Sequence, residues 1–193
     1  MFGSWEVNVT VGSLPQKVAT AVGELSEKLV GAEYTPIAYL GSQVVNGTNH
    51  AVLAEQLLTT GKDTKNIVLL IFNEKQNTAE LTSIERVLES GGELGGFKVD
   101  VQTDITGEAK EQLDKAFEGY VGVDVKPIAL LGTQVTKGTD YVYVAEVSPV
   151  VQDPVASVEI ITVNNLQKTV SFADLLANRQ ENSLGYAFTW LKK

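Results

Sequence analysis

The sequence contains no cysteine. This absence excludes disulfide bonds, a zinc site with thiolate ligands and a cysteine nucleophile. Histidine occurs once, as His50, which excludes a histidine-rich metal cluster and any acid–base mechanism that needs two imidazoles. No pair of carboxylates is marked by its spacing as an acid–base couple either. The sequence therefore predicts a protein that is not an enzyme and that holds no cofactor and no metal ion.

Basic clusters and long apolar runs are also lacking. Fifteen Lys and Arg residues stand against 24 Asp and Glu, which gives a formal net charge of −9. A chain without clustered cations neutralises phosphates poorly, so we expect no nucleic-acid partner. No apolar run approaches the roughly 18 residues of a membrane-spanning helix, and the first residues lack the basic region and apolar core of a signal peptide. We expect no membrane partner and, without cysteines, a cytoplasmic location.

What the sequence does contain is an internal repeat. Pro36–Glu55 aligns without a gap with Pro127–Glu146, 91 positions later, and eleven of the 20 aligned residues are identical. The same offset pairs Asn73 with Asn164. A fixed offset of this kind indicates a duplicated structural unit.

Each copy has a helical pattern that follows an alternating segment, Trp5–Val11 or Phe97–Val101, which predicts a strand. Apolar residues recur at helical spacing between Pro15 and Val30, and Gly31 follows as a stop signal. The second copy repeats the stripe from Leu113 to Val121. The spacing predicts one amphipathic helix in each copy.

Extended segments follow the first helix. Tyr34–Val45 and Asn49–Thr59 are separated by Asn46-Gly47, the pair that best supplies the positive φ of a tight hairpin turn. Asn66–Phe72 is apolar and rich in β-formers, which predicts a buried strand.

The rest of the first copy has a weaker pattern. We interpret Leu81–Leu88 as a short helical segment, and Gly96–Val101 as a last strand that also leads into the second helix. One helix on an antiparallel sheet is an α+β arrangement. We therefore predict the α+β class, with two domains at residues 1–101 and 102–193. Each would have one α-helix packed on a four- to five-stranded antiparallel β-sheet.

The predicted hairpin carries the segment Gln43-Val44-Val45-Asn46-Gly47. It resembles the Gln-Val-Val-X-Gly signature of the cystatins, and the lack of cysteine is similar to their stefin branch. Gly3 lies 40 residues before Gln43, near where that family has a glycine in its N-terminal trunk. Together with the repeat, the resemblance implies a tandem duplication of two cystatin-like domains.

The resemblance also implies a function, since cystatins inhibit papain-like cysteine proteases. Gly3, the loop from Gln43 to Gly47 and a second hairpin loop would form an apolar wedge that plugs the protease cleft without reacting. The loop offers two valines and a glycine, which suit apolar packing and close backbone approach. We therefore expect a reversible, tight-binding inhibitor.

The second copy departs from this pattern. Its loop reads Gln134-Val135-Thr136-Lys137-Gly138, which is more polar. The family's second hairpin loop usually has Pro-Trp or Leu-Pro; residues 73–77 have neither, and residues 164–168 offer only Leu166 as an apolar tip. We expect Gln134, Val135, Thr136, Lys137, Gly138 and Leu166 to contribute to protease binding, with inhibition coming mainly from the first copy.

Two alternatives stay open at this point. A non-inhibitory structural or protein-interaction module on the duplicated scaffold would share these features, and the polar second loops favour it. We expect a monomer, with a domain-swapped dimer through the first hairpin as the alternative.

His50 is interpreted as a packing or exposed aromatic position. Asn46-Gly47-Thr48 also matches a glycosylation sequon; a glycan there would block the wedge, which again favours the cytoplasm.

Overall fold

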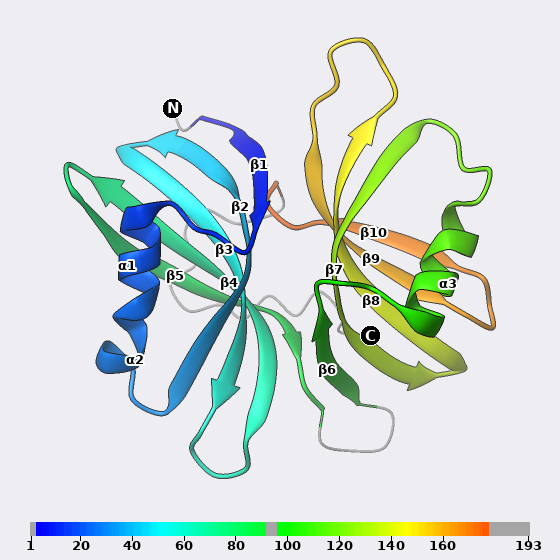
Figure 1. Ribbon diagram of the computed structural model, residues 1–193, viewed down its shortest axis with the longest axis horizontal. Helices are drawn as coiled ribbons and strands as arrows, with labels where there is room; N and C mark the ends of the chain where they lie inside the picture. Colours follow the sequence, from blue (N-terminus) through cyan, green and yellow to red (C-terminus); the bar gives the residue numbers. More distant parts are fainter. Residues whose placement is uncertain (1–2, 92–95, 178–193) are drawn as a thin grey trace. The chain divides into compact units, whose positions relative to one another are not determined.

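The computed structural model describes residues 3–91 and 96–177, and its division into two compact units falls between Glu89 and Ser90. The first unit is one five-stranded antiparallel sheet with strands in sequence order and two short helices (Figure 1). Its elements are β1 (Trp5–Val11), α1 (Gln16–Gly23), α2 (Leu25–Lys28), β2 (Ala32–Val45), β3 (Gly47–Leu58), β4 (Thr64–Lys75) and β5 (Thr78–Glu89).

The second unit is also a five-stranded antiparallel sheet, in the order β10-β9-β8-β7-β6. Its elements are β6 (Phe97–Gln102), α3 (Gly107–Phe117), β7 (Val123–Thr136), β8 (Gly138–Pro149), β9 (Ser157–Asn164) and β10 (Val170–Asp174). β6 pairs with β7, so it does not close the first sheet as the sequence led us to expect. The expected domain limits, 1–101 and 102–193, place the boundary inside β6, one residue before the strand ends.

The predicted fold class is wrong. The described residues form a β-rich fold of two five-stranded antiparallel sheets, whose strands reach 14 residues while the helices have 8, 4 and 11 residues. They do not form two α+β domains of the cystatin type, each with one long helix on its sheet.

Two segments expected to be helical account for much of the difference. The helix predicted from Pro15 to Val30 ends at Gly23, and after the single turn of α2 the backbone of Leu29 is extended. Leu81–Leu88 is not helical but belongs to β5, which pairs with β4 along most of its length. Pairing with a neighbouring strand decides such a segment more strongly than its local propensity does.

A second difference from the predicted α+β fold is that each sheet is buried on both faces. In β4, the residues from Ile67 to Phe72 are all at most 2% exposed, although successive side chains point to opposite faces. In β8, Tyr141–Ala145 are likewise buried at every position. An antiparallel sheet covered by a helix on one face would instead alternate buried and exposed residues.

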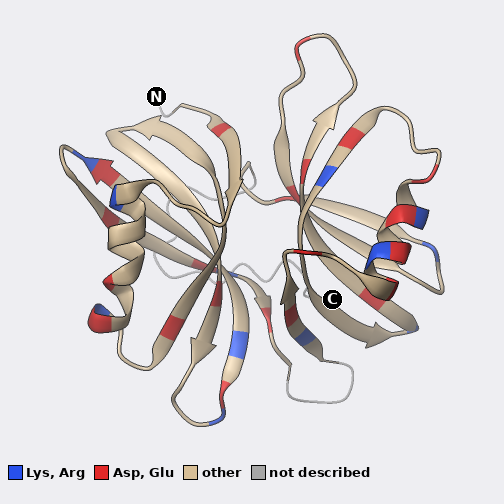
Figure 2. Cartoon of the chain, viewed as in Figure 1, with Lys and Arg blue, Asp and Glu red and all other residues tan. Residues whose placement is uncertain are grey.

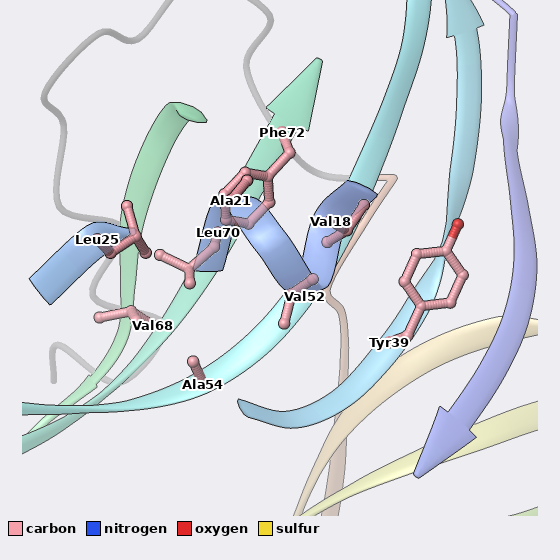
Figure 3. Close-up of a cluster of buried hydrophobic side chains, with 9 residues drawn as sticks. All are labelled: Val18, Ala21, Leu25, Tyr39, Val52, Ala54, Val68, Leu70 and Phe72. Atoms are coloured by element: carbon pink, nitrogen blue, oxygen red, sulfur yellow. The ribbon is translucent and has the colours of Figure 1, made fainter. Parts of the chain in front are cut away.

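The helices pack on one face of each sheet. Figure 3 shows Val18, Ala21 and Leu25 of the first unit lying against a cluster from β2, β3 and β4 that includes Leu70 and Phe72. Burying one such side chain stabilises the fold by about 1.5–3 kcal/mol. The corresponding cluster of the second unit comprises Ala109, Leu113, Leu130, Tyr141, Tyr143, Ala145, Val147, Ile161 and Val163.

The charged residues show no segregation by sign. Lys and Arg are interspersed with Asp and Glu in both units (Figure 2). On the helices, Lys28 pairs with Glu24 at 2.9 Å and Lys110 with Asp114 at 2.7 Å, each four residues apart. Within residues 3–91 and 96–177, no helix has both the length and the apolar character needed to cross a membrane.

Each sheet has one position where an edge strand passes close to the backbone of its neighbour. A Cβ added at Gly41 of β2 would overlap the carbonyl O of Glu6 in β1, and one at Gly132 of β7 would overlap that of Lys98 in β6. These two glycines are repeat equivalents. They permit the strands to approach where the pairing register shifts.

We predict that Gly41→Ala and Gly132→Ala each lower the free energy of unfolding by about 1–3 kcal/mol, because the edge strand must move away from the added methyl group. Gly23→Ala in α1 is the control, since a Cβ there meets nothing within 4 Å. It should leave stability unchanged or raise it by up to about 1 kcal/mol. Urea unfolding of the three variants checks this, and equal stabilities would contradict the close approach.

Candidate functional site

The first unit brings its N-terminal residues beside the β2–β3 hairpin. β1 pairs with β2 so that Trp5 lies opposite Gln43, and the antiparallel direction carries the preceding residues toward the hairpin turn. The N–H of Gly3 donates to the carbonyl O of Val44 at 2.9 Å. The Nε2 of Gln43 donates to the carbonyl O of Gly3, also at 2.9 Å. Two hydrogen bonds therefore hold Gly3 against the hairpin.

The first hairpin has a tight turn at Asn46-Gly47, where Gly47 but not Asn46 has a positive φ. Val45 lies opposite Gly47, which has a φ of +98°. A Cβ on Gly47 would lie 2.5 Å from the carbonyl O of Glu74 in β4. Glycine is required here both by the backbone angle and by the close approach of the second hairpin.

The second hairpin, between β4 and β5, contacts the first one. Asn73 Nδ2 lies 3.4 Å from the carbonyl O of Asn46 and donates to it. The β4–β5 turn contains Gln76 with a φ of +56°. We call Gly3, residues 43–47 and residues 75–78 the hairpin edge; these segments gather at one end of the first unit, at the upper left of Figure 1.

The hairpin edge is apolar on one hairpin and polar on the other. Val44 is 69% exposed and projects a methyl-bearing side chain into solvent. Val45 is half-buried, and Asn46 is exposed. On the second hairpin the exposed residues are all polar, namely Lys75, Gln76, Asn77 and Thr78. The surface thus offers one strongly exposed apolar side chain, backbone groups, amides, a lysine and a hydroxyl group.

A chain of polar side chains joins helix α1 to the second hairpin. Lys17 Nζ of α1 lies 2.8 Å from Glu74 Oε1 and also donates to the carbonyl O of Gln76 at 3.2 Å. The Nε2 of His50 lies 2.9 Å from Glu74 Oε2, and its Nδ1 lies 2.8 Å from the hydroxyl O of Tyr39. We call Lys17, Glu74, His50 and Tyr39 the latch.

Two residues of the latch, Glu74 and Tyr39, have shifted pKa values. Hydrogen bonds from Lys17 and then from His50 lower the pKa of Glu74. Burial is the main cause that raises the pKa of Tyr39. A carboxyl group with a lowered pKa stabilises the fold fully above its ordinary pKa, and this stabilisation is lost as the pH falls through its folded-state value. Glu74 therefore stays ionised, and the latch stays closed, somewhat below the ordinary pKa of a glutamate.

Tyr39, His50 and Glu74 are residue types that also serve in acid–base catalysis. Here Tyr39 is 6% and His50 is 8% exposed, and each is hydrogen-bonded to its neighbour in the latch. These contacts give the latch a structural role, since they connect α1 to the second hairpin. His50 is a buried packing position, one of the two interpretations of the sequence.

A second polar chain consists of side-chain amides. Asn73 Nδ2 donates to Asn49 Oδ1 at 2.8 Å, and Asn49 Nδ2 donates to Gln43 Oε1 at 3.2 Å. Gln43 in turn donates to Gly3, as described above. We call Asn73, Asn49 and Gln43 the amide chain. It runs from the second hairpin across the first to Gly3.

In the second unit, Asn164 organises the equivalent turn. Its Nδ2 contacts Thr136 Oγ1 and the carbonyl O of Lys137, both at 3.2 Å, and its Oδ1 accepts from the N–H of Leu166 at 3.0 Å. Gly138 has a φ of +92°, and a Cβ there would lie 2.6 Å from the Cβ of Leu166. The two hairpin turns of this unit therefore also lie in contact.

This turn presents a different surface from that of the first unit. Val135 is 66% and Leu166 is 61% exposed, and both Thr136 and Lys137 are exposed as well. Gln134 lies opposite Phe97 of β6 and is half-buried. The second turn thus exposes two apolar side chains and Lys137, whereas the hairpin edge of the first unit exposes Val44 and Lys75.

The structure brings together the residues singled out in each copy, but in two separate units. Gly3 and residues 43–47 lie at the first turn, and residues 134–138 and Leu166 at the second. Whether they bind a protease stays a prediction. The side-chain contacts of Lys17, Glu74, Asn49 and Asn73 were not predicted from the sequence. Their contacts connect positions up to 59 apart along the chain, which local patterns do not reveal.

Comparison with known proteins yields no match: no protein-family model fits the chain, and no curated protein or solved structure is significantly similar to it. The family resemblance of residues 43–47 is therefore carried by the sequence motif alone.

We predict that Lys17→Met raises the pKa of Glu74 toward its ordinary value, because the larger of the two lowering contacts is removed. The Lys17 side chain is 40% exposed, so the loss of stability near neutral pH should be about 1 kcal/mol or less. The loss should vanish at a pH below the folded-state pKa of Glu74, where the carboxyl is protonated in both proteins.

An NMR titration of the Glu74 carboxyl, with urea unfolding at neutral and acidic pH, measures both effects. Lys65→Met is the matched control, since Lys65 pairs with Glu55 at 3.5 Å and does not belong to the latch. It should leave the pKa of Glu74 unchanged. An unchanged titration in Lys17→Met would show that the latch does not control this group.

Proposed function

We propose that the chain is a reversible, tight-binding inhibitor of papain-like cysteine proteases that acts mainly through the hairpin edge of the first unit. The observation that carries the proposal is the pair of hydrogen bonds holding Gly3 to Val44 and Gln43. They join the N-terminal trunk and the first hairpin into one projection, which is the combination that the motif's family uses to fill a protease cleft.

The physical properties of the edge support this mode of binding. Val44 offers an exposed apolar group, and Gly47 keeps the turn narrow. The segments are already held by hydrogen bonds, so little conformational entropy is lost on binding. Nanomolar affinity needs about 12 kcal/mol, and an interface of roughly 1,600 Å² supplies this when its anchors pack well.

The proposal includes several further points. The protein blocks its target without turning over a substrate, uses no cofactor and acts in the cytoplasm, in keeping with its lack of cysteine. Residues 134–138 and Leu166 of the second unit contribute less, because Thr136 and Lys137 make that turn more polar.

A specific observation favours a second candidate, a non-inhibitory protein-interaction module. The second hairpin of the first unit exposes Lys75, Gln76 and Asn77 rather than an apolar tip. Such a surface suits a polar partner better than the apolar wall of a protease cleft.

Inhibition of papain by the full chain, measured with a fluorogenic peptide substrate, distinguishes the two. We expect Val44→Asp to weaken inhibition by at least about 30-fold, the effect of losing a central contact residue. Val135→Asp is the matched control, the same change at the repeat-equivalent and similarly exposed position, and should weaken inhibition by no more than about threefold.

Both valines are exposed, so neither variant should unfold the protein. No inhibition by the unaltered chain at micromolar concentration would reject the inhibitor and leave the interaction module. Equal effects of the two variants would refute the assignment of binding mainly to the first unit.

A further inference from the structure

The amide chain links four segments through three hydrogen bonds. Its bonds join β4 to β3, β3 to β2, and β2 to the residues ahead of β1. Asn73 lies 70 positions after Gly3, yet only two side chains, those of Asn49 and Gln43, stand between them.

All three bonds run in the same direction. Asn73 donates through its nitrogen to Asn49; Asn49 and Gln43 each accept through the oxygen and donate onward through the nitrogen, and the last acceptor is the carbonyl of Gly3. Hydrogen bonds aligned in this way polarise and strengthen one another. Asn49 and Asn73 are half-buried, so water competes with these bonds less than it does at the exposed tip.

The chain also explains what the glutamine of the motif does. Both the oxygen and the nitrogen of its side-chain amide are engaged within the protein, by Asn49 and Gly3. Gln43 is therefore occupied before any partner arrives. Val44, its neighbour, is left as the side chain that projects.

We propose that Asn73, Asn49 and Gln43 are positioning residues that couple the second hairpin to the N-terminal trunk, so that the hairpin edge assembles as one unit. Its functional consequence rests on the proposed function, since a trunk that is held in place would favour binding in a cleft. The coupling itself is a property of the free protein and can be measured without a protease.

The test is the hydrogen-exchange rate of the Gly3 amide, followed by NMR in the full chain. This amide donates to Val44 and reports whether the trunk is docked. Gln43→Met removes the direct contact and should speed exchange by about tenfold. Asn49→Leu and Asn73→Leu touch neither Gly3 nor its acceptor, and each should still speed exchange by about threefold to fivefold.

Asn164→Leu is the matched control, the same substitution at the equivalent position of the second unit, and should leave the exchange of Gly3 unchanged. The amides of Val52 and Leu70, which lie in the core of the first unit, show whether a variant is still folded. Only acceleration at Gly3 beyond that at these core amides supports the coupling.

Three outcomes would overturn the proposal. The first is that Gln43→Met leaves the Gly3 amide protected. The second is that only Gln43→Met has an effect, because Asn49 and Asn73 would then not couple the second hairpin to Gly3. The third is that Asn164→Leu acts as strongly as Asn73→Leu. Failure of the native chain to inhibit papain would reject the proposed function and leave these exchange results as they stand.

Discussion

The close approach of β1 to Gly41 of β2 is the constraint on which the candidate site depends. A larger residue at Gly41 would overlap the backbone of Glu6 and push the edge strand away. Only with β1 in this position does the register set Trp5 opposite Gln43 and carry Gly3 to Val44. The position of the trunk is thus determined by backbone packing in the sheet, and its side-chain contacts then hold it there.

The two copies keep this backbone feature but differ in the polar groups around it. In the first unit the latch ties α1 to the second hairpin. In the second unit Asn164 and Asn165 connect the turns directly, and Asn165 Oδ1 accepts from the N–H of Thr139 at 2.8 Å. The hydroxyl of Tyr143, whose pKa is raised by burial, donates to the carbonyl O of Ala109 in α3. One scaffold therefore carries two differently stabilised surfaces.

The hairpin at Asn46-Gly47 could be predicted from the sequence because its signal is local. The fold class could not, since β5 depends on pairing with β4 over residues that read as helical. The uninterrupted apolar run in β4, Ile67–Phe72, was the available sign that both faces of the sheet are buried. The sequence also contains a sign of the latch, because all four of its positions change residue type between the copies. These pairs are Lys17 and Glu108, Tyr39 and Leu130, His50 and Tyr141, and Glu74 and Asn165.

The central claim is that the hairpin edge of the first unit is the surface that contacts a protease. The most direct measurement is the amide hydrogen-exchange pattern of the full chain with and without papain. The account predicts new protection at Gly3, at residues 43–48 and at residues 75–78, with little change at residues 134–138. Protection confined to the second unit, or none at saturating papain, would contradict it.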